Sequence, residues 1–114
     1  MRVLVCGGRD FSDRGAIHKA LNDLSRAEVI DAVIEGDAHG ADRIAGYWAR
    51  QRGITNLKFK ADWATHGKGA GPIRNQRMID EGRPDLVVAF PGGKGTADMT
   101  RRARSAGIDV VEVG

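Results

Sequence analysis

The sequence predicts a three-layer α/β fold in which helices cover both faces of a doubly wound parallel sheet of about five strands. Two observations predict it. Short apolar runs alternate with segments of helical periodicity along the whole chain, and glycine-rich turns separate them. Strands that are separated by helices need crossover connections, which pair them in parallel. The 114 residues suit one domain, so residues 1–114 are expected to form a single unit.

The first strand and helix are predicted within residues 3–24. Residues 3–6 form a continuous apolar run that ends at Gly7-Gly8, which is typical of a strand buried on both faces. Ser12 is the expected N-cap of a helix that runs to about residue 24. The apolar face of this helix consists of Ile17, Ala20, Leu21 and Leu24.

The middle of the chain predicts a second strand, a helix and a weaker third strand. Residues 32–34 form a buried strand that ends at Glu35-Gly36. A helix is expected from about residue 39 to residue 52, because Gly53 is a natural stop. In residues 55–59 only Leu57 and Phe59 alternate, so the third strand has the weakest pattern.

The second half of the chain begins with an irregular segment and ends with a strand. Residues 63–71 are rich in glycine, and Pro72 suits the first position of a helix that runs to about residue 81. Residues 85–90 form the clearest strand, and a glycine-rich loop over residues 91–96 leads into a helix that ends near Ala106 and Gly107. The last strand comprises Val110, Val111 and Val113.

Composition excludes several classes of protein. No apolar run approaches the roughly 20 residues of a membrane span, and the apolar start of the chain is too short for a signal peptide. The single cysteine, Cys6, excludes an internal disulfide and fits a reducing compartment, so we expect a cytoplasmic protein without a membrane partner. The formal charge of +3 slightly favours phosphate-bearing partners, but it is too small to indicate a nucleic-acid footprint.

Three glycine-rich segments fall where predicted strands end: residues 7–10, 36–40 and 91–96. In parallel doubly wound sheets, ligands bind outside the carboxyl ends of the strands, at the switch point of the strand order. The three segments are therefore expected to converge on one site for a nucleotide or a nucleotide-derived phosphate ligand.

The segment Pro91-Gly92-Gly93-Lys94-Gly95-Thr96 is the expected centre of that site. Its glycines leave backbone N–H groups free to face an anion, and the following helix adds its partial positive charge. Thr96 can cap that helix or donate its hydroxyl to a phosphate, and Lys94 can neutralise charge. The spacing differs from that of a Walker loop, and a plain tight turn is the alternative reading.

The two earlier loops supply further candidate ligand-binding residues: Gly7, Gly8, Arg9, Asp10, Gly36, Asp37, His39 and Gly40. Arg9 can bind phosphate in a bidentate manner, or else pair with Asp10 on the surface. Asp37 can bind a ribose hydroxyl or cap the next helix, and Asp42 can favour the helix dipole. His39 can act as acid, base or donor. It has no second ligand at a suitable spacing, so no metal is expected. No cofactor is expected either.

Residues 63–75 combine an aromatic ring, an imidazole and several cations in one stretch. Trp63 can stack on a base, and His66 lies close to it in the sequence. Arg74 and Asn75 occupy the first turn of the predicted helix, where anions are favoured. The alternative is a mobile surface loop with scattered charge.

Four motifs together resemble the YspA/YpsA-related branch of the SLOG superfamily. They are Gly7-Gly8-Arg9-Asp10, Gly36-Asp37-x-x-Gly40-Ala41-Asp42, Trp63…Gly71-Pro72-x-Arg74-Asn75-x-x-Met78 and Pro91-Gly92-Gly93-x-Gly95-Thr96. The resemblance covers essentially the whole chain in order. It implies a Rossmann-like fold, binding of nucleotides or nucleotide-derived signals, and assembly into a homo-oligomer.

The LOG relatives in that superfamily hydrolyse nucleoside 5′-monophosphates, and their motif is Pro-Gly-Gly-x-Gly-Thr-x-x-Glu with an arginine on an earlier helix. Arg74 matches the arginine, but Met99 stands where the glutamate is expected. Asp98 lies one residue earlier, about 100° around a helix. Arg74 and Asp98 are thus the candidate catalytic residues, and the missing glutamate favours binding over cleavage.

Three functions follow from these observations. The first is a ligand-binding module, such as a sensor of a nucleotide-derived signal. The second is an N-glycosidic hydrolase of nucleoside monophosphates, in which Asp98, Asp37 or His39 replaces the glutamate. The third is a nucleic-acid-binding module that is similar to the DprA proteins, and the mild charge and 5% aromatic content disfavour it.

Overall fold

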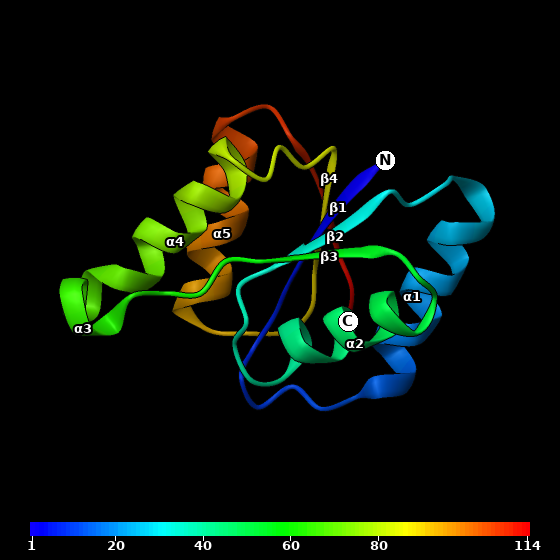
Figure 1. The fold of residues 1–114 in the computed structure, drawn as a ribbon, viewed down its shortest axis with the longest axis horizontal. Helices are drawn as coiled ribbons and strands as arrows, with labels where there is room; N and C mark the ends of the chain where they lie inside the picture. Colours follow the sequence, from blue (N-terminus) through cyan, green and yellow to red (C-terminus); the bar gives the residue numbers. More distant parts are fainter.

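A five-stranded, all-parallel sheet forms the middle layer of the structure, a computed structural model that describes residues 1–114 (Figure 1). Its strands follow the order β3-β2-β1-β4-β5 across the sheet. Their bounds are β1 Arg2–Cys6, β2 Ala32–Glu35, β3 Thr55–Lys58, β4 Leu86–Ala89 and β5 Asp109–Glu112. The central strand β1 is in register with both neighbours, since Leu4 pairs with Ile34 of β2 and with Val87 of β4. The predicted doubly wound parallel sheet is confirmed.

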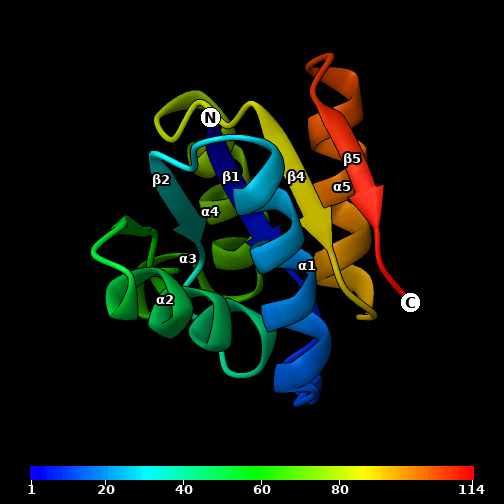
Figure 2. The ribbon, with the colours of Figure 1, turned by 90° about the vertical axis from the view of Figure 1, so that its right-hand side faces the viewer.

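Helices cover both faces of the sheet (Figure 2). Helices α1 (Arg14–Ala27) and α2 (Ala41–Gln51) pack on one face, and α4 (Ala70–Asp80) and α5 (Lys94–Ser105) pack on the other. The short helix α3 (Trp63–His66) and the 3₁₀ turn η1 (Gly67–Gly69) lead into α4 and project from one end of the molecule (Figure 1). These are the three layers of a Rossmann-like fold.

The alternation of side chains along β1 builds two separate cores. Val3 and Val5 face α1 and α2, where they join a cluster that includes Trp48. Leu4 and Cys6 face α4 and α5, where they join a cluster that includes Met99. Because both faces are covered, β1 reads as the continuous apolar run from which the strand was predicted.

The helix ends differ from the predictions in three places. Asp13, rather than Ser12, caps α1, because its carboxylate accepts a hydrogen bond from the backbone N–H of Ala16 at 3.0 Å. Helix α1 also continues to Ala27, beyond the expected end. Helix α2 begins at Ala41, and its N-cap is Gly40, which contributes no side-chain hydrogen bond. The alternative of Asp37 as the cap of this helix is therefore wrong.

Residues 63–71, which were expected to be irregular, are mostly helical. Asp62 caps α3 by accepting a hydrogen bond from the N–H of Thr65 at 3.1 Å. Helix α4 then starts at Ala70, two residues before Pro72. Proline is tolerated there because the first N–H groups of a helix have no intrahelical partner. Because residues 63–71 are rich in glycine, the sequence did not predict this helical segment.

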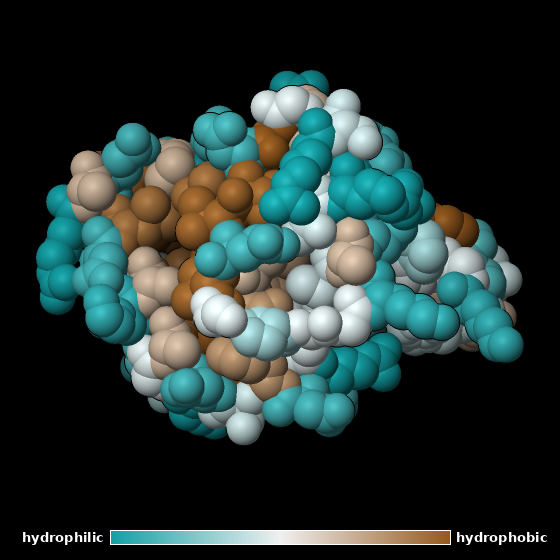
Figure 3. All heavy atoms as spheres, turned by 180° about the vertical axis from the view of Figure 1, so that it is seen from behind, coloured by the Kyte–Doolittle hydropathy of each residue, from teal (hydrophilic) through white to brown (hydrophobic).

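The edge strand β5 leaves an apolar surface open. Figure 3 faces this side of the molecule and shows apolar side chains gathered over it. Val111 of β5 is 47% exposed, and Leu86, Val113 and Leu24 beside it are only partly buried. No helix has the length and apolar character needed to cross a bilayer.

Candidate anion-binding site

A cavity of about 640 Å³ opens at the carboxyl ends of β1 and β4. Beyond β1 the chain moves outward through β2 and β3, then returns to place β4 on the other side of β1. The cavity therefore lies at the switch point of the strand order, where ligands bind in this class of sheet. We call it the main cavity.

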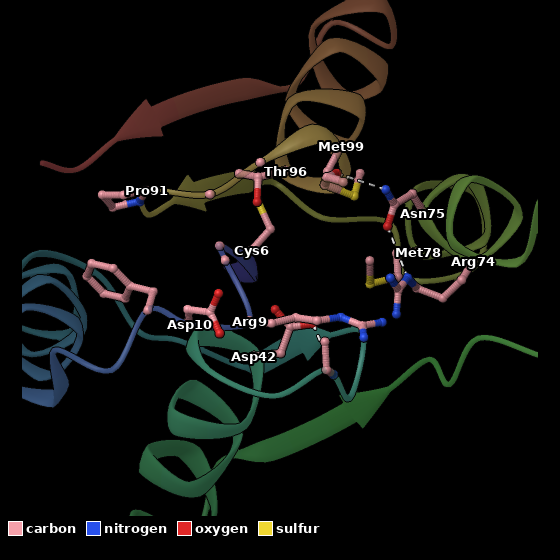
Figure 4. Close-up of a pocket in the computed structure, with 17 residues that line it drawn as sticks. Cys6, Arg9, Asp10, Asp42, Arg74, Asn75, Met78, Pro91, Thr96 and Met99 are labelled. Atoms are coloured by element: carbon pink, nitrogen blue, oxygen red, sulfur yellow. Dashed lines mark hydrogen bonds between the residues drawn. The ribbon is translucent and has the colours of Figure 1, made fainter. Parts of the chain in front are cut away.

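Four segments that are distant in sequence form its walls, and one of them contributes only Ala38 and Asp42 (Figure 4). The loop after β1 contributes residues 7–11, and the loop after β4 with the first turn of α5 contributes most of residues 91–96. Helix α4 contributes one wall from the opposite side. The predicted site residues that line it are Gly7, Gly8, Arg9, Asp10, Arg74, Asn75, Pro91, Gly92, Gly93, Gly95 and Thr96.

Backbone contacts hold the loops against one another. The N–H of Gly8 donates to the carbonyl of Pro91 at 2.9 Å, which joins the loop after β1 to the loop after β4. Gly40 has φ +81°, and a Cβ there would lie 2.6 Å from the carbonyl oxygen of Arg9. Only glycine permits both the conformation and the close approach at this position. The absence of a side chain at Gly40 thus lets the second loop pack on the first.

The N-terminus of α5 faces the main cavity without a capping side chain. Its N-cap is Gly93, and no side chain hydrogen-bonds the first N–H groups of the helix. Beyond the adjoining residues and the backbone of the helix itself, a Cβ built on Gly93 or Gly95 would meet no protein atom within 4 Å, whereas one on Gly92 would lie 2.7 Å from the N of Gly8. The fold therefore requires Gly92, while Gly93 and Gly95 leave open space beside free N–H groups. The hydroxyl of Thr96 forms no hydrogen bond within the protein and lines the same space.

Arg74 reaches the main cavity from the opposite wall. Its Nη1 donates to the carbonyl oxygen of Gly36 at 2.6 Å, and its Nε donates to Oδ1 of Asn75 at 3.0 Å. The remaining nitrogen, Nη2, has no protein acceptor. Burial lowers the pKa of this guanidinium, and the positive charge of Arg9 acts in the same direction against the opposing charge of Asp42. A guanidinium that is partly buried beside a second cation favours an anion in the cavity.

Asn75 holds α4 and α5 together. Its side-chain Nδ2 donates to the carbonyl of Gly95 at 3.2 Å and to Asp98 at 3.0 Å, while its Oδ1 accepts from Arg74. Every polar atom of this buried amide is therefore occupied by protein groups. Asn75 is a positioning residue, because it orients Arg74 relative to the first turn of α5.

The floor of the main cavity contains three sulfur atoms. Cys6, Met78 and Met99 line it together, and Met99 is 1% exposed (Figure 4). Burial and the nearby charge of Asp42 raise the pKa of the Cys6 thiol to about 12, so it stays protonated and unreactive. The position that was matched to the LOG glutamate therefore faces the cavity, but it carries a thioether.

Asp98, one residue earlier, faces away from this floor. Arg101 and Arg102 both pair with its carboxylate. Burial alone would raise the pKa of Asp98, but the hydrogen bonds from Arg102 and Asn75 and the charges of both arginines lower it overall. Asp98 remains ionised and lies outside the main cavity, which does not favour it as the substitute for the missing glutamate.

Asp42 is the buried acid of the main cavity, whereas its position at the start of a helix predicted only an interaction with the helix dipole. It is 6% exposed and accepts hydrogen bonds from the N–H groups of Gly36 at 2.9 Å and Ala38 at 3.4 Å. Burial, followed by the neighbouring carboxylate of Glu35, raises the pKa of Asp42 to about 7. Its place in the motif Gly36-Asp37-x-x-Gly40-Ala41-Asp42 was the available signal, but its burial depends on the packed fold.

The remaining predicted residues are distributed outside the main cavity. Lys94, Trp63 and Asp98 line a neighbouring groove, and Gly36, Asp37 and His39 line a smaller cavity of about 220 Å³. Asp37 adopts φ +56°, and its carboxylate lies 3.7 Å from Arg43 and 3.8 Å from Lys58. Gly40 packs against the first loop as described above. His66 lines neither cavity nor the groove.

These features define a Rossmann-like protein with a cavity at its switch point and an uncapped helix N-terminus beside it. The sequence profile of the YspA, cpYpsA-related SLOG family matches residues 1–66. The chain belongs to this family. It is also 43% identical over 121 residues to the Gene 61 protein of Mycobacterium phage D29, an alignment that covers 99% of this chain and 96% of the phage protein.

Two solved structures share the fold at low sequence identity. DNA processing protein A (DprA) from Streptococcus pneumoniae superposes with a TM-score of 0.78 at 19% identity, covering 99% of this chain and 50% of DprA. UDP-GlcNAc 2-epimerase from Methanocaldococcus jannaschii, in complex with UDP-GlcNAc and UDP, superposes with a TM-score of 0.55 at 21% identity. That match covers 99% of this chain and 32% of the epimerase. The present chain therefore corresponds to one part of each larger protein.

Proposed function

We propose that this protein binds a nucleotide or a nucleotide-derived ligand in the main cavity, with a phosphate at the N-terminus of α5. The observation that carries the proposal is the convergence of three free donor groups on that end of the helix. They are the uncapped backbone N–H groups after Gly93, the hydroxyl of Thr96 and Nη2 of Arg74. A helix N-terminus with free N–H groups is a general binding site for phosphate.

The rest of the cavity suits the nucleoside. Its volume of about 640 Å³ lies within the range typical of small-molecule sites. Cys6, Met78 and Met99 supply an apolar floor, and polarisable sulfur atoms pack well against aromatic rings. Two acids that line the cavity, the exposed Asp10 and the buried Asp42, can accept hydrogen bonds from ribose or base. The complex of UDP and UDP-GlcNAc with the epimerase is consistent with such a ligand on this kind of sheet.

The test is a Gly95→Ala variant. A Cβ at Gly95 enters the open space beside the free N–H groups, so it should block the phosphate, whereas the fold has room for it. Alanine in a helix is about 0.5–1 kcal/mol better than glycine. The melting temperature should therefore stay the same or rise, while the stabilisation by AMP should disappear. Gly15→Ala is the matched control, because Gly15 occupies the same helical position in α1, away from the main cavity.

A second variant tests the hydroxyl separately. Thr96→Val keeps the shape of the side chain and should weaken AMP binding about ten-fold through the lost charge-assisted hydrogen bond. Titration calorimetry with AMP, UMP and GMP measures the affinities. If both variants bind these nucleotides as tightly as the wild type does, the phosphate does not sit at α5 and the proposal fails.

The titrating carboxyl group of Asp42 favours a second candidate function, which is N-glycosidic hydrolysis of a nucleoside monophosphate. Its pKa of about 7 is near the value that suits a general acid or base, and it lines the cavity that Asp98, Asp37 and His39 do not line. Release of free base from AMP, lost in Asp42→Asn while AMP still binds, is the result that would establish hydrolysis. The absence of any base release would leave binding alone.

A further inference from the structure

A second hollow of about 710 Å³ lies between α3, α4 and the first turns of α5. We call it the basic groove. It is lined by cationic and polar side chains and by one tryptophan: Arg9, Trp63, Lys68, Arg74, Asn75, Lys94, Asp98 and Arg101. The groove and the main cavity share Arg9, Arg74, Asn75 and Gly95, so they form two neighbouring compartments on either side of these residues.

Positive charge dominates the basic groove. Five of its lining residues are lysine or arginine, and Asp98 is the one carboxylate. Arg101 and Arg102 already pair with Asp98, so it does not neutralise the others. The side chains of Lys68, Lys94 and Arg9 form no hydrogen bond or ion pair with the protein. Unpaired cations that gather in one hollow create a positive potential that attracts an anion of high charge.

Arg9 is held at the boundary between the two compartments. Its guanidinium lies 5.6 Å from the centre of the Trp63 ring, a cation–π contact that leaves its N–H groups free. Trp63 is 49% exposed, at the start of the helical segment that projects from the molecule (Figure 1). Arg74, with its free Nη2, lies at the same boundary. Two guanidinium groups therefore line both the main cavity and the basic groove.

We propose that the ligand is a nucleoside di- or triphosphate, whose nucleoside occupies the main cavity and whose second and third phosphoryl groups extend into the basic groove. This inference rests on the proposed function, because it places the first phosphate at the N-terminus of α5. One phosphate does not require a second compartment with its own unpaired cations. A chain of phosphoryl groups does, since each group adds negative charge that the lysines and Arg9 can neutralise.

The experiment compares AMP, ADP and ATP by titration calorimetry with the full chain, in EDTA so that each nucleotide keeps its full charge. Affinity should rise from AMP to ADP to ATP. The double variant K68Q/K94Q should lower the affinity for ATP about ten-fold or more and change the ATP-to-AMP ratio accordingly. The matched control K19Q/R26Q removes two positive charges from α1, on the opposite face of the sheet, and should retain the wild-type ratio. Increasing salt should weaken ATP binding more than AMP binding.

Three other outcomes would each contradict this inference, and each leads to a different conclusion. If AMP, ADP and ATP bind equally, the proposed function stands and the basic groove holds no phosphate. If no nucleotide binds but inorganic tripolyphosphate stabilises the wild type and not K68Q/K94Q, the proposed function fails and the groove is a general anion site. If an eight-residue single-stranded oligothymidylate binds more tightly than ATP and displaces it, the groove is a nucleic-acid interface.

Discussion

At the scale of single residues, the environment of each acid separates the possible roles. Asp98 and Asp42 both lie near the main cavity, but Asp98 is ion-paired by two arginines, whereas Asp42 is buried beside Glu35. The pKa of Asp98 is lowered and that of Asp42 is raised to about 7. Of these two acids, Asp42 is the one whose pKa lies near neutral pH, so we expect it to contribute to the pH dependence of this protein.

The first prediction concerns stability against pH. In the unfolded chain Asp42 loses its proton near pH 4, but in the folded protein it keeps the proton up to about pH 7. The unfolded state binds fewer protons in this interval, so the free energy of unfolding falls as pH rises through it. The difference is at most about 4 kcal/mol. Asp42→Asn keeps an acceptor for Gly36 and Ala38 and should flatten the decline.

Urea unfolding at about pH 4.5, 6 and 8 measures this effect. Asp109→Asn, which removes an exposed carboxylate from β5, is the control for loss of charge. If Asp42→Asn and the wild type lose stability in parallel over this range, Asp42 is not the group that titrates.

At the scale of elements, the relation between α4 and α5 organises the site. Helix α5 presents its N-terminus to the main cavity, and α4 presents Arg74 from the other side. Asn75 ties the two together through Gly95 and Asp98. The two faces of the first turn of α5 therefore line two different hollows. One face, with Gly93 and Thr96, lines the main cavity, and the other, with Lys94 and Ala97, lines the basic groove.

The directions in which successive side chains of α5 point decide which chemical group faces the main cavity. Because successive residues turn by about 100° around a helix, Met99 points to the floor of the main cavity, and Asp98 points to the groove. The residue of this turn that faces the main cavity is therefore a methionine, and the neighbouring carboxylate lies outside that cavity.

At the scale of the whole molecule, cationic side chains and exposed apolar side chains gather on different parts of the surface. The cations collect around α3, α4 and α5, whereas apolar side chains gather on the side of the molecule seen in Figure 3. There the outermost strand β5 exposes Val111, flanked by the acidic residues Asp109 and Glu112, and its outer side pairs with no other strand. Native proteins usually cover or charge such an edge. We propose that a second copy of the chain covers it, which agrees with the oligomer that the family resemblance implies.

Val111→Lys tests this proposal. A lysine in place of the half-exposed valine should prevent the contact and convert the protein to a monomer, as measured by light scattering after gel filtration. Val29→Lys is the control: this valine, just beyond the end of α1, is more exposed than Val111 (76% against 47%), and its replacement should leave the assembly unchanged. A wild-type protein that is monomeric at high concentration would contradict the proposal.

The sequence by itself determined the order of the elements, the parallel sheet and the edge that carries the site. These follow from local patterns: apolar runs such as residues 3–6, helical spacing, and glycine-rich turns at strand ends. Because parallel strands all end at one edge, the position of the loops follows from the order of elements alone. The sequence therefore predicts that residues 7–10 and residues 91–96 lie close together.

The tertiary structure decided what each side chain faces and how it is charged. Asp42 was read as a helix-terminal acid, and only its burial beside Glu35 makes it a group that titrates near pH 7. Lys94 was expected to face the ligand at the glycine-rich loop, but the packing of α5 turns it to the basic groove. That groove also joins Arg9, Trp63 and Arg101, which no local pattern relates. Periodicity reports which residues share an element, whereas burial and the joining of distant side chains depend on how the elements pack.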